Sequence, residues 1–107
     1  FGLAAATPQS GGHLVVAVPL EPDTFDPHKA VAAATKEIDF NIYQGLISYD
    51  TDGGIIPCLA ESWDISEDGT VYTFKLRKGV RFHNGRKLTL DDVRFSLERI
   101  RDDATGS

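Results

Sequence analysis

The sequence predicts a mixed α/β fold (α+β) built from short strands, hairpins and two main helices. Two observations predict it. Segments of alternating polar and apolar residues are bounded by turn dipeptides, as in 71–77 after Asp68-Gly69. Two other stretches, 33–43 and 90–100, carry apolar residues at helical spacing. With 107 residues and 41% hydrophobic content, the chain has the size and composition of one small globular domain.

The charge balance argues against a protein that binds nucleic acid. The chain has 11 basic and 16 acidic residues, a formal charge of −5, and no run of Lys and Arg. Binding to phosphates needs clustered basic side chains. The single cysteine, Cys58, excludes an intrachain disulfide and a metal site made of several cysteines. No apolar run reaches the length of about 20 residues that spans a bilayer.

The two ends of the sequence are polar or small and lack periodicity. We expect residues 1–11 to be a disordered tail or the remnant of a signal peptide, because Ala4-Ala5-Ala6 has the pattern of a signal-peptidase site. This favours an exported protein. Residues 102–107 predict a loop that follows a helix, which suggests that the chain is part of a longer one.

The first half of the chain predicts a strand, a helix and a second strand. The apolar run 14–18 is typical of a strand buried on both faces. A helix is expected to begin near 33–35, with Gly45 just past its end. A short strand then covers 46–49, and 50–54 is a turn that contains Asp and Gly residues.

The second half predicts a hairpin followed by a capped helix. The strand 62–65 pairs with 71–77, on which Tyr72, Phe74 and Leu76 share one face. A further short strand is expected at 80–82 before the turn Asn84-Gly85. Thr89 and Asp92 have the spacing of a capping box. The helix that follows has an apolar stripe, which we expect to be buried, formed by Leu90, Val93, Leu97 and Ile100, and an exposed pair, Arg94 and Glu98.

Candidate catalytic and metal-binding residues are few. Asp26-Pro27-His28 places a carboxylate near an imidazole, and one hypothesis is a small hydrolase with His28 as general base. No nucleophile is identifiable beside them, and a turn that redirects the chain is the better interpretation. His13, His28 and His83 lack the spacing of metal ligands. We therefore expect no enzyme activity, no metal site and no cofactor.

Several sequence blocks occur in an order that resembles a known family. The resemblance is to the oligopeptide/dipeptide-type (family 5) extracellular solute-binding proteins, the receptors of ABC importers, and it runs from about residue 12 to 101. The blocks are Glu21-Pro22-Asp23-Thr24-Phe25-Asp26-Pro27-His28, Ile42-Tyr43-Gln44-Gly45-Leu46, Leu59-Ala60-Glu61-Ser62-Trp63, the stretch 68–85 and Leu88-Thr89-x-x-Asp92-Val93. Two details depart from the family: Cys58 stands where a small residue such as Gly is usual, and Arg86-Lys87 replaces the commoner Thr-Pro.

The resemblance implies the N-terminal portion of a periplasmic-binding-protein type II-like fold. Residues 12–107 would form the first strand and helix of lobe 1 and part of a small hairpin-rich subdomain, and the remainder of the family fold would be absent. It also implies location in the periplasm or on the outer face of the cytoplasmic membrane, in a bacterium or an archaeon. An ABC permease would be the membrane partner.

The resemblance also implies a ligand and a binding segment. Short peptides would be bound, with extended backbone pairing to the peptide as an added strand. The residues that would supply one wall of the ligand cleft are Lys29, Ala30, Val31, Ala32, Ala33, Ala34 and Thr35. The alternatives are a nickel chelate, an opine or an oligosaccharide as ligand, or a structural module without a ligand. Because the other lobe is absent, we expect the chain alone to bind ligand weakly and to self-associate through exposed edges and apolar patches.

Overall fold

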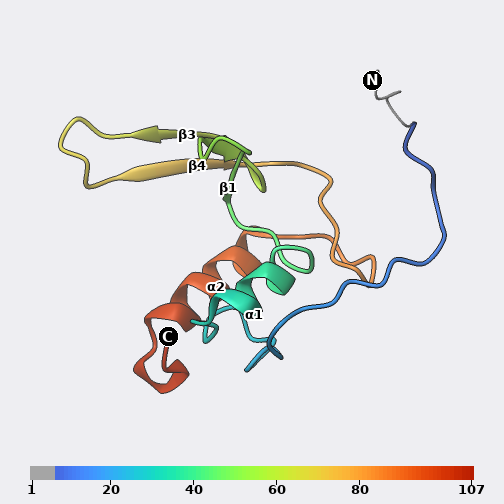
Figure 1. Ribbon diagram of the computed structural model, residues 1–107. Helices are drawn as coiled ribbons and strands as arrows, with labels where there is room; N and C mark the ends of the chain where they lie inside the picture. The colour runs from blue at the N-terminus through green and yellow to red at the C-terminus, as the bar shows by residue number, and fades with distance from the viewer. Residues whose placement is uncertain (1–6) are drawn as a thin grey trace.

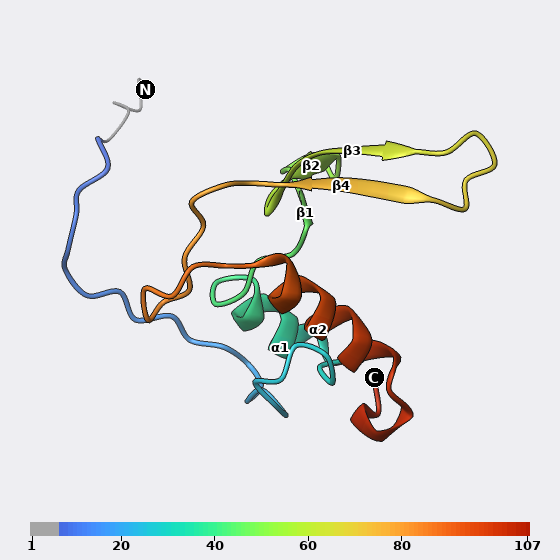
Figure 2. The same ribbon diagram turned by 180° about the vertical axis from the view of Figure 1, so that it is seen from behind.

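Two helices and two β-hairpins make up the structure, a computed structural model that describes residues 7–107. The hairpins lie on one side of the molecule, and the N-terminal segment runs past the helices as an extended arm (Figures 1 and 2). The overall extents are 52 × 31 × 31 Å. In chain order the elements are α1 (Ala33–Asp39), β1 (Ile47–Tyr49), β2 (Ile55–Pro57), β3 (Ala60–Ile65), β4 (Tyr72–Leu76), α2 (Leu90–Arg101) and a final 3₁₀ turn (Asp103–Thr105).

Strands β1 and β2 form the first antiparallel hairpin, in which Ser48 pairs with Ile56. The predicted turn at 50–54 is confirmed. Oδ1 of Asp50 accepts hydrogen bonds from the backbone N–H groups of Asp52 and Gly54, at 2.9 and 2.7 Å. Gly53 has a φ of +82°, a conformation that glycine adopts without a steric penalty.

Strands β3 and β4 form the second hairpin, which confirms the predicted pairing of 62–65 with 71–77. Trp63 pairs with Phe74, and their ring centroids lie 6.5 Å apart. Phe74 and Leu76 are half-buried, whereas the side chains on the opposite face of β4 are exposed. Tyr72 is also exposed, because it lies toward the tip of a hairpin that projects away from the helices (Figures 1 and 2).

Helix α1 begins where the sequence predicts but ends earlier, so the placement of Gly45 just past its end is wrong. The helix ends at Asp39, with Phe40 as its C-cap. Nδ2 of Asn41 donates to the carbonyl of Glu37, which is the acceptor that the Asn41 N–H would use in a continuing helix. That N–H instead donates to the carbonyl of Ile38. This side-chain competition for a backbone carbonyl ends the helix.

The predicted strand at 14–18 is wrong for this structure. The segment is extended but carries no strand pairing, and the side chains of Leu14 and Val15 are 88% and 93% exposed. A strand needs a neighbour for its backbone hydrogen bonds, and none of the described strands lies beside it. The strand expected at 80–82 is likewise reduced to one bridge, between Arg81 and Lys87.

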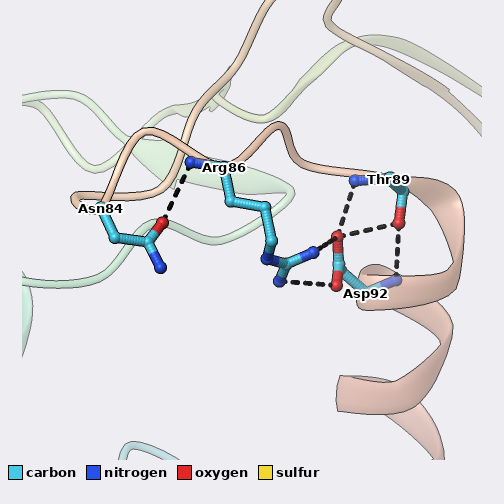
Figure 3. A network of polar contacts seen from close by, with 4 residues as sticks. All are labelled: Asn84, Arg86, Thr89 and Asp92. Carbon is cyan, nitrogen blue, oxygen red and sulfur yellow. Dashed lines mark hydrogen bonds and ion pairs between the residues drawn. The ribbon is translucent and has the colours of Figure 1, made fainter.

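A capping box starts helix α2, as predicted. Oγ1 of Thr89 accepts from the N–H of Asp92, and the carboxylate of Asp92 accepts from the N–H of Thr89. The guanidinium of Arg86 binds both carboxylate oxygens of Asp92, at 2.9 and 3.1 Å, and the backbone N–H of Arg86 donates to Oδ1 of Asn84 (Figure 3). One carboxylate therefore joins the 84–89 loop to the start of α2.

The apolar stripe of α2 is present but is not buried, contrary to the prediction. Val93 is half-buried, whereas Leu97 and Ile100 remain 51% and 44% exposed. In residues 7–107 the buried apolar side chains are Ala30 and Ala60 alone. Buried small side chains contribute little hydrophobic stabilisation, because that term scales with the apolar area removed from water. Local hydrogen bonds and ion pairs therefore matter more here than in an ordinary domain.

We predict that Thr89→Ala destabilises α2 by about 1 kcal/mol, because it removes the side chain that caps the helix. Urea unfolding followed by far-ultraviolet circular dichroism measures this change. Thr51→Ala, at an exposed turn position, is the matched control and is expected to have a far smaller effect. Equal effects of the two substitutions would contradict a stabilising role of the Thr89 cap.

We also predict how the stabilising contribution of Asp92 depends on pH. Hydrogen bonds from Arg86, and then from the N–H and hydroxyl of Thr89, lower the pKa of Asp92 from its usual 3.8 to about 2. Its stabilising contribution is therefore fully present above its unfolded pKa and is lost as the pH falls through about 2. We expect the difference in stability between the wild type and Asp92→Asn to be constant near neutral pH and to shrink between pH about 4 and about 2. Unfolding midpoints measured across that range test this, and a difference that stays constant to pH 2 would refute it.

Candidate functional site

The residues predicted to bind ligand form one continuous segment, residues 29–35, which we call the binding wall. Lys29 ends a turn, 30–32 is irregular, and 33–35 is the first turn of α1. The segment does not face solvent uniformly. Lys29, Val31, Ala32 and Ala33 are exposed, Ala34 is half-buried, and Ala30 and Thr35 are buried. A partner could therefore reach the middle of the wall, whereas Ala30 and Thr35 anchor it.

The turn that precedes the wall is held by Asp26. Its backbone carbonyl accepts hydrogen bonds from the N–H groups of Lys29 and Ala30, both at 3.0 Å. Its carboxylate accepts from the N–H of His28 at 3.1 Å, and its own N–H donates to Oγ1 of Thr24. The Asp26-Pro27-His28 block is thus a hydrogen-bonded turn, as the sequence analysis favours.

Arg99 of helix α2 contacts the same turn. Nη1 donates to Oδ1 of Asp26 at 2.9 Å, and Nη2 donates to Oδ2. Nη1 also lies 2.7 Å from Nδ1 of His28. Because a guanidinium can only donate, Nδ1 of His28 is the acceptor in this contact. Sequence reasoning did not find Arg99, and no local pattern marks it, since it lies 73 residues from Asp26.

This contact sets the charge state of the turn. The hydrogen bonds from Arg99 lower the pKa of Asp26 from its usual 3.8 to about 2. The same hydrogen bonds raise the pKa of Arg99. Both groups are therefore ionised across the physiological pH range. The side chains of Arg99 and Asp26 are 31% and 26% exposed, so water competes for them less than for a fully exposed pair.

The far end of the wall is held by a second pair of residues. Oγ1 of Thr35 donates to the carboxylate of Asp23 and accepts from the N–H of Asp23 at 3.2 Å. The hydroxyl of Thr35 is therefore committed to an internal contact. In addition, the hydroxyl of Tyr43 donates to the carbonyl of Phe25 at 2.8 Å. These bonds tie the segment before the wall to helix α1 and to the residues just after it.

An open hollow of about 1020 Å³ lies between the two helices and the loop that precedes α2. Its lining comes from four separate segments, 27–28, 39–46, 80–83 and the inner side of 92–100 without Arg94 and Glu98, together with Leu59 and Leu88. The exposed stripe of α2 forms one of its sides. Sequence reasoning found the stripe but did not predict the hollow, because the other segments come together only in the folded chain.

Asp39 is the least expected buried group near the hollow. Its side chain is 7% exposed, and neither carboxylate oxygen has a hydrogen-bond partner among the described residues. Both oxygens are shielded from solvent, although Asp39 is one of the residues that line the hollow. In residues 7–107 no group of three or more His, Cys, Asp or Glu side chains is arranged to hold a metal ion. No described helix is long and apolar enough to cross a membrane.

Comparison with known proteins places these features in a family. Residues 54–107 match the family described as bacterial extracellular solute-binding proteins, family 5 middle. The chain is 35% identical over 95 residues to the periplasmic oligopeptide-binding protein OppA of Haemophilus influenzae, covering 89% of this chain and 18% of that protein. It is 37% identical to di/tripeptide-binding protein 2 of Pseudomonas aeruginosa, covering 95% and 21%. The chain thus spans about a fifth of the length of these relatives.

Solved structures agree with the sequence matches. H. influenzae OppA in complex with the peptide RPPGFSPFR superposes with a TM-score of 0.77 at 36% identity, covering 81% of this chain and 17% of that one. The periplasmic binding protein DppA of Helicobacter pylori, in complex with the peptide STSA, gives 0.67 at 38% identity, covering 79% and 18%. NikZ of Campylobacter jejuni, in complex with Ni(L-His), gives 0.57 at 44% identity, covering 58% and 13%.

The sequence blocks, the pair of helices with projecting hairpins and the match to more than one solved receptor agree with one another. The chain belongs to the family 5 bacterial extracellular solute-binding proteins.

Proposed function

We propose that the chain is the N-terminal part of the substrate-binding component of a bacterial ABC importer that binds short peptides. In this proposal residues 12–107 supply the first part of one lobe and part of the hairpin-rich subdomain. The protein acts outside the cytoplasmic membrane, where it collects peptides and delivers them to a permease. Residues 29–35 supply one wall of the peptide site.

One observation carries this proposal. The segment belongs to a family of extracellular solute-binding proteins, and the relatives that it matches over most of its length are named for oligopeptides and for di- and tripeptides. Two of the matching structures hold a peptide. The exposed residues Ala32 and Ala33 support the proposed wall, since small side chains let another backbone approach closely.

The expected mechanism is closure of two lobes around the peptide. Closure is a shift between open and closed populations, so the peptide must contact the closed state more favourably than the open one. A wall that keeps its shape before the peptide arrives lowers the ordering cost of binding. The bonds of Asp26 and Thr35, one at each end of the wall, support this role.

The geometry of the Asp26–His28 turn argues for binding rather than hydrolysis. In a catalytic dyad the carboxylate orients the imidazole ring that acts as the base. Here the carboxylate of Asp26 accepts from the backbone N–H of His28 and from Arg99. The ring nitrogen Nδ1 of His28 is occupied by Arg99. We therefore propose that the protein is not an enzyme.

A second candidate ligand is a nickel chelate. The observation that favours it is the similarity to NikZ in complex with Ni(L-His), at 44% identity over 58% of this chain. Because the chain covers 13% of that protein, most of NikZ lies outside the match. A direct binding experiment with a short peptide and with Ni(L-His) distinguishes the two candidate ligands.

We predict that the longer receptor that contains this segment binds tri-alanine and the peptide STSA, and that Ala32→Arg weakens this binding at least about tenfold by filling the exposed middle of the wall. Isothermal titration calorimetry measures both affinities. We expect the 107-residue chain alone to bind tri-alanine weakly or not at all, because one wall offers few contacts.

The matched control is Val71→Arg, at an exposed position beside the projecting hairpin tip, which is expected to leave the affinity unchanged. A receptor that binds Ni(L-His) but neither peptide would establish the nickel chelate as ligand instead. Equal losses in Ala32→Arg and Val71→Arg would show that residues 29–35 are not a wall of the site.

We also predict that the isolated chain self-associates. Apolar side chains at 14–15 and along α2 are exposed, and exposed patches of this kind favour association. Sedimentation velocity should give a size that grows with protein concentration, and Val15→Lys should reduce that growth more than Thr51→Lys does. A monomer at every concentration would count against the prediction.

A further inference from the structure

Helix α2 reaches across the fold to the start of the binding wall. Its residue Arg99 contacts both carboxylate oxygens of Asp26 and the ring of His28. We propose that Arg99 is a positioning residue for peptide binding, because it fixes the turn from which the wall begins. This inference rests on the proposed function of the chain.

Asp26 links Arg99 to the binding wall, because its carboxylate binds Arg99 and its carbonyl binds the first residues of the wall. Its carbonyl accepts from the first two N–H groups of the wall, those of Lys29 and Ala30. Its N–H and carboxylate are bound at the same time, to Thr24, His28 and Arg99. A rotation of Asp26 would therefore displace Lys29 and Ala30 directly. Its other partners are close in sequence, whereas Arg99 is 73 residues away and ties the turn to helix α2.

The chemistry of the contact requires arginine. A guanidinium presents several N–H groups in a rigid plane, so it binds two carboxylate oxygens and a third acceptor at once. Lysine has a single compact ammonium group on a flexible stem, and it keeps the charge without this geometry. Replacement of Arg99 by lysine should therefore preserve the attraction to Asp26 but hold the Asp26 carboxylate less firmly in one orientation.

Another pair on the same helix provides a comparison. Arg94 and Glu98 also form an ion pair on α2, but their side chains are 68% and 66% exposed, and Arg94 donates to Glu98, four residues along the same helix. The side chains of Arg99 and Asp26 are less than half as exposed as those of Arg94 and Glu98, and their contact joins helix α2 to the N-terminal segment. Loss of Arg94 therefore measures the effect of removing a charge from α2, without any effect on the turn.

The two ends of the wall give an internal control. Arg99 acts on the start, through Asp26, whereas the far end is held by the bonds between Asp23 and Thr35. Loss of Arg99 should speed amide hydrogen exchange at Lys29 and Ala30, whose N–H groups bind Asp26. It should leave the N–H of Asp23, which binds Thr35, much less affected. A general loss of stability would instead speed exchange at all three positions.

The first experiment compares Arg99→Gln, Arg99→Lys and Arg94→Gln in the longer receptor, with tri-alanine as the probe in calorimetry. We expect Arg99→Gln to weaken binding about tenfold, Arg99→Lys to restore part of that loss, and Arg94→Gln to have no effect. Equal affinities of the wild type and Arg99→Gln would overturn the inference while leaving the proposed function intact. Equal losses in Arg99→Gln and Arg94→Gln would also overturn it.

The second experiment needs no peptide. Amide exchange, resolved by nuclear magnetic resonance, is measured at Lys29, Ala30 and Asp23 in the same variants without ligand. Faster exchange confined to Lys29 and Ala30 in Arg99→Gln supports the inference. Unchanged exchange at Lys29 and Ala30, or equally accelerated exchange at all three positions, refutes it. If the wild type binds no tri-alanine, the proposed function fails, and this second measurement still decides whether Arg99 positions the wall.

Discussion

The contact of Arg99 with Asp26 and His28 is the interaction on which the arrangement of this chain most depends. Residues 7–107 bury almost no apolar side chain, so the hydrophobic term that usually holds distant segments together is small. A charged, bidentate contact with a partly shielded environment takes that role between the N-terminal segment and helix α2. Without the Arg99 contact, the N-terminal segment would be held mainly by the hydrogen bonds of Thr35 and Tyr43. Both residues lie in helix α1 or just after it, so these bonds do not reach helix α2.

The same contact joins the turn that precedes the binding wall to the helix whose apolar stripe borders the hollow. The binding wall lies directly after the Asp26–His28 turn, and the apolar stripe of α2 lies beside the open hollow. His28 and Arg99 line that hollow and also hold the turn. The turn that precedes the binding wall therefore borders the hollow, and His28 and Arg99 contact each other at that border.

Features set by neighbouring residues were predictable from the sequence. The capping box of Thr89 and Asp92 and the β3–β4 hairpin follow from side-chain chemistry within a few positions. Features that need a distant partner were not. The run 14–18 has a strand's composition but no neighbouring strand, and the stripe of α2 has no cover in the described part of the chain. The binding wall came from family resemblance, and Arg99, which holds it, left no local signal.

The long separation between Asp26 and Arg99 has a consequence for the order of folding. Closing a loop of 73 residues costs about 2 kcal/mol more in chain entropy than bringing together Ile65 and Tyr72 across the tip of the second hairpin. Hairpins form in about 1–10 μs and helices faster. The hairpins and α2 should thus be formed before the N-terminal arm docks, so the binding wall takes its shape in a late step, after its support already exists.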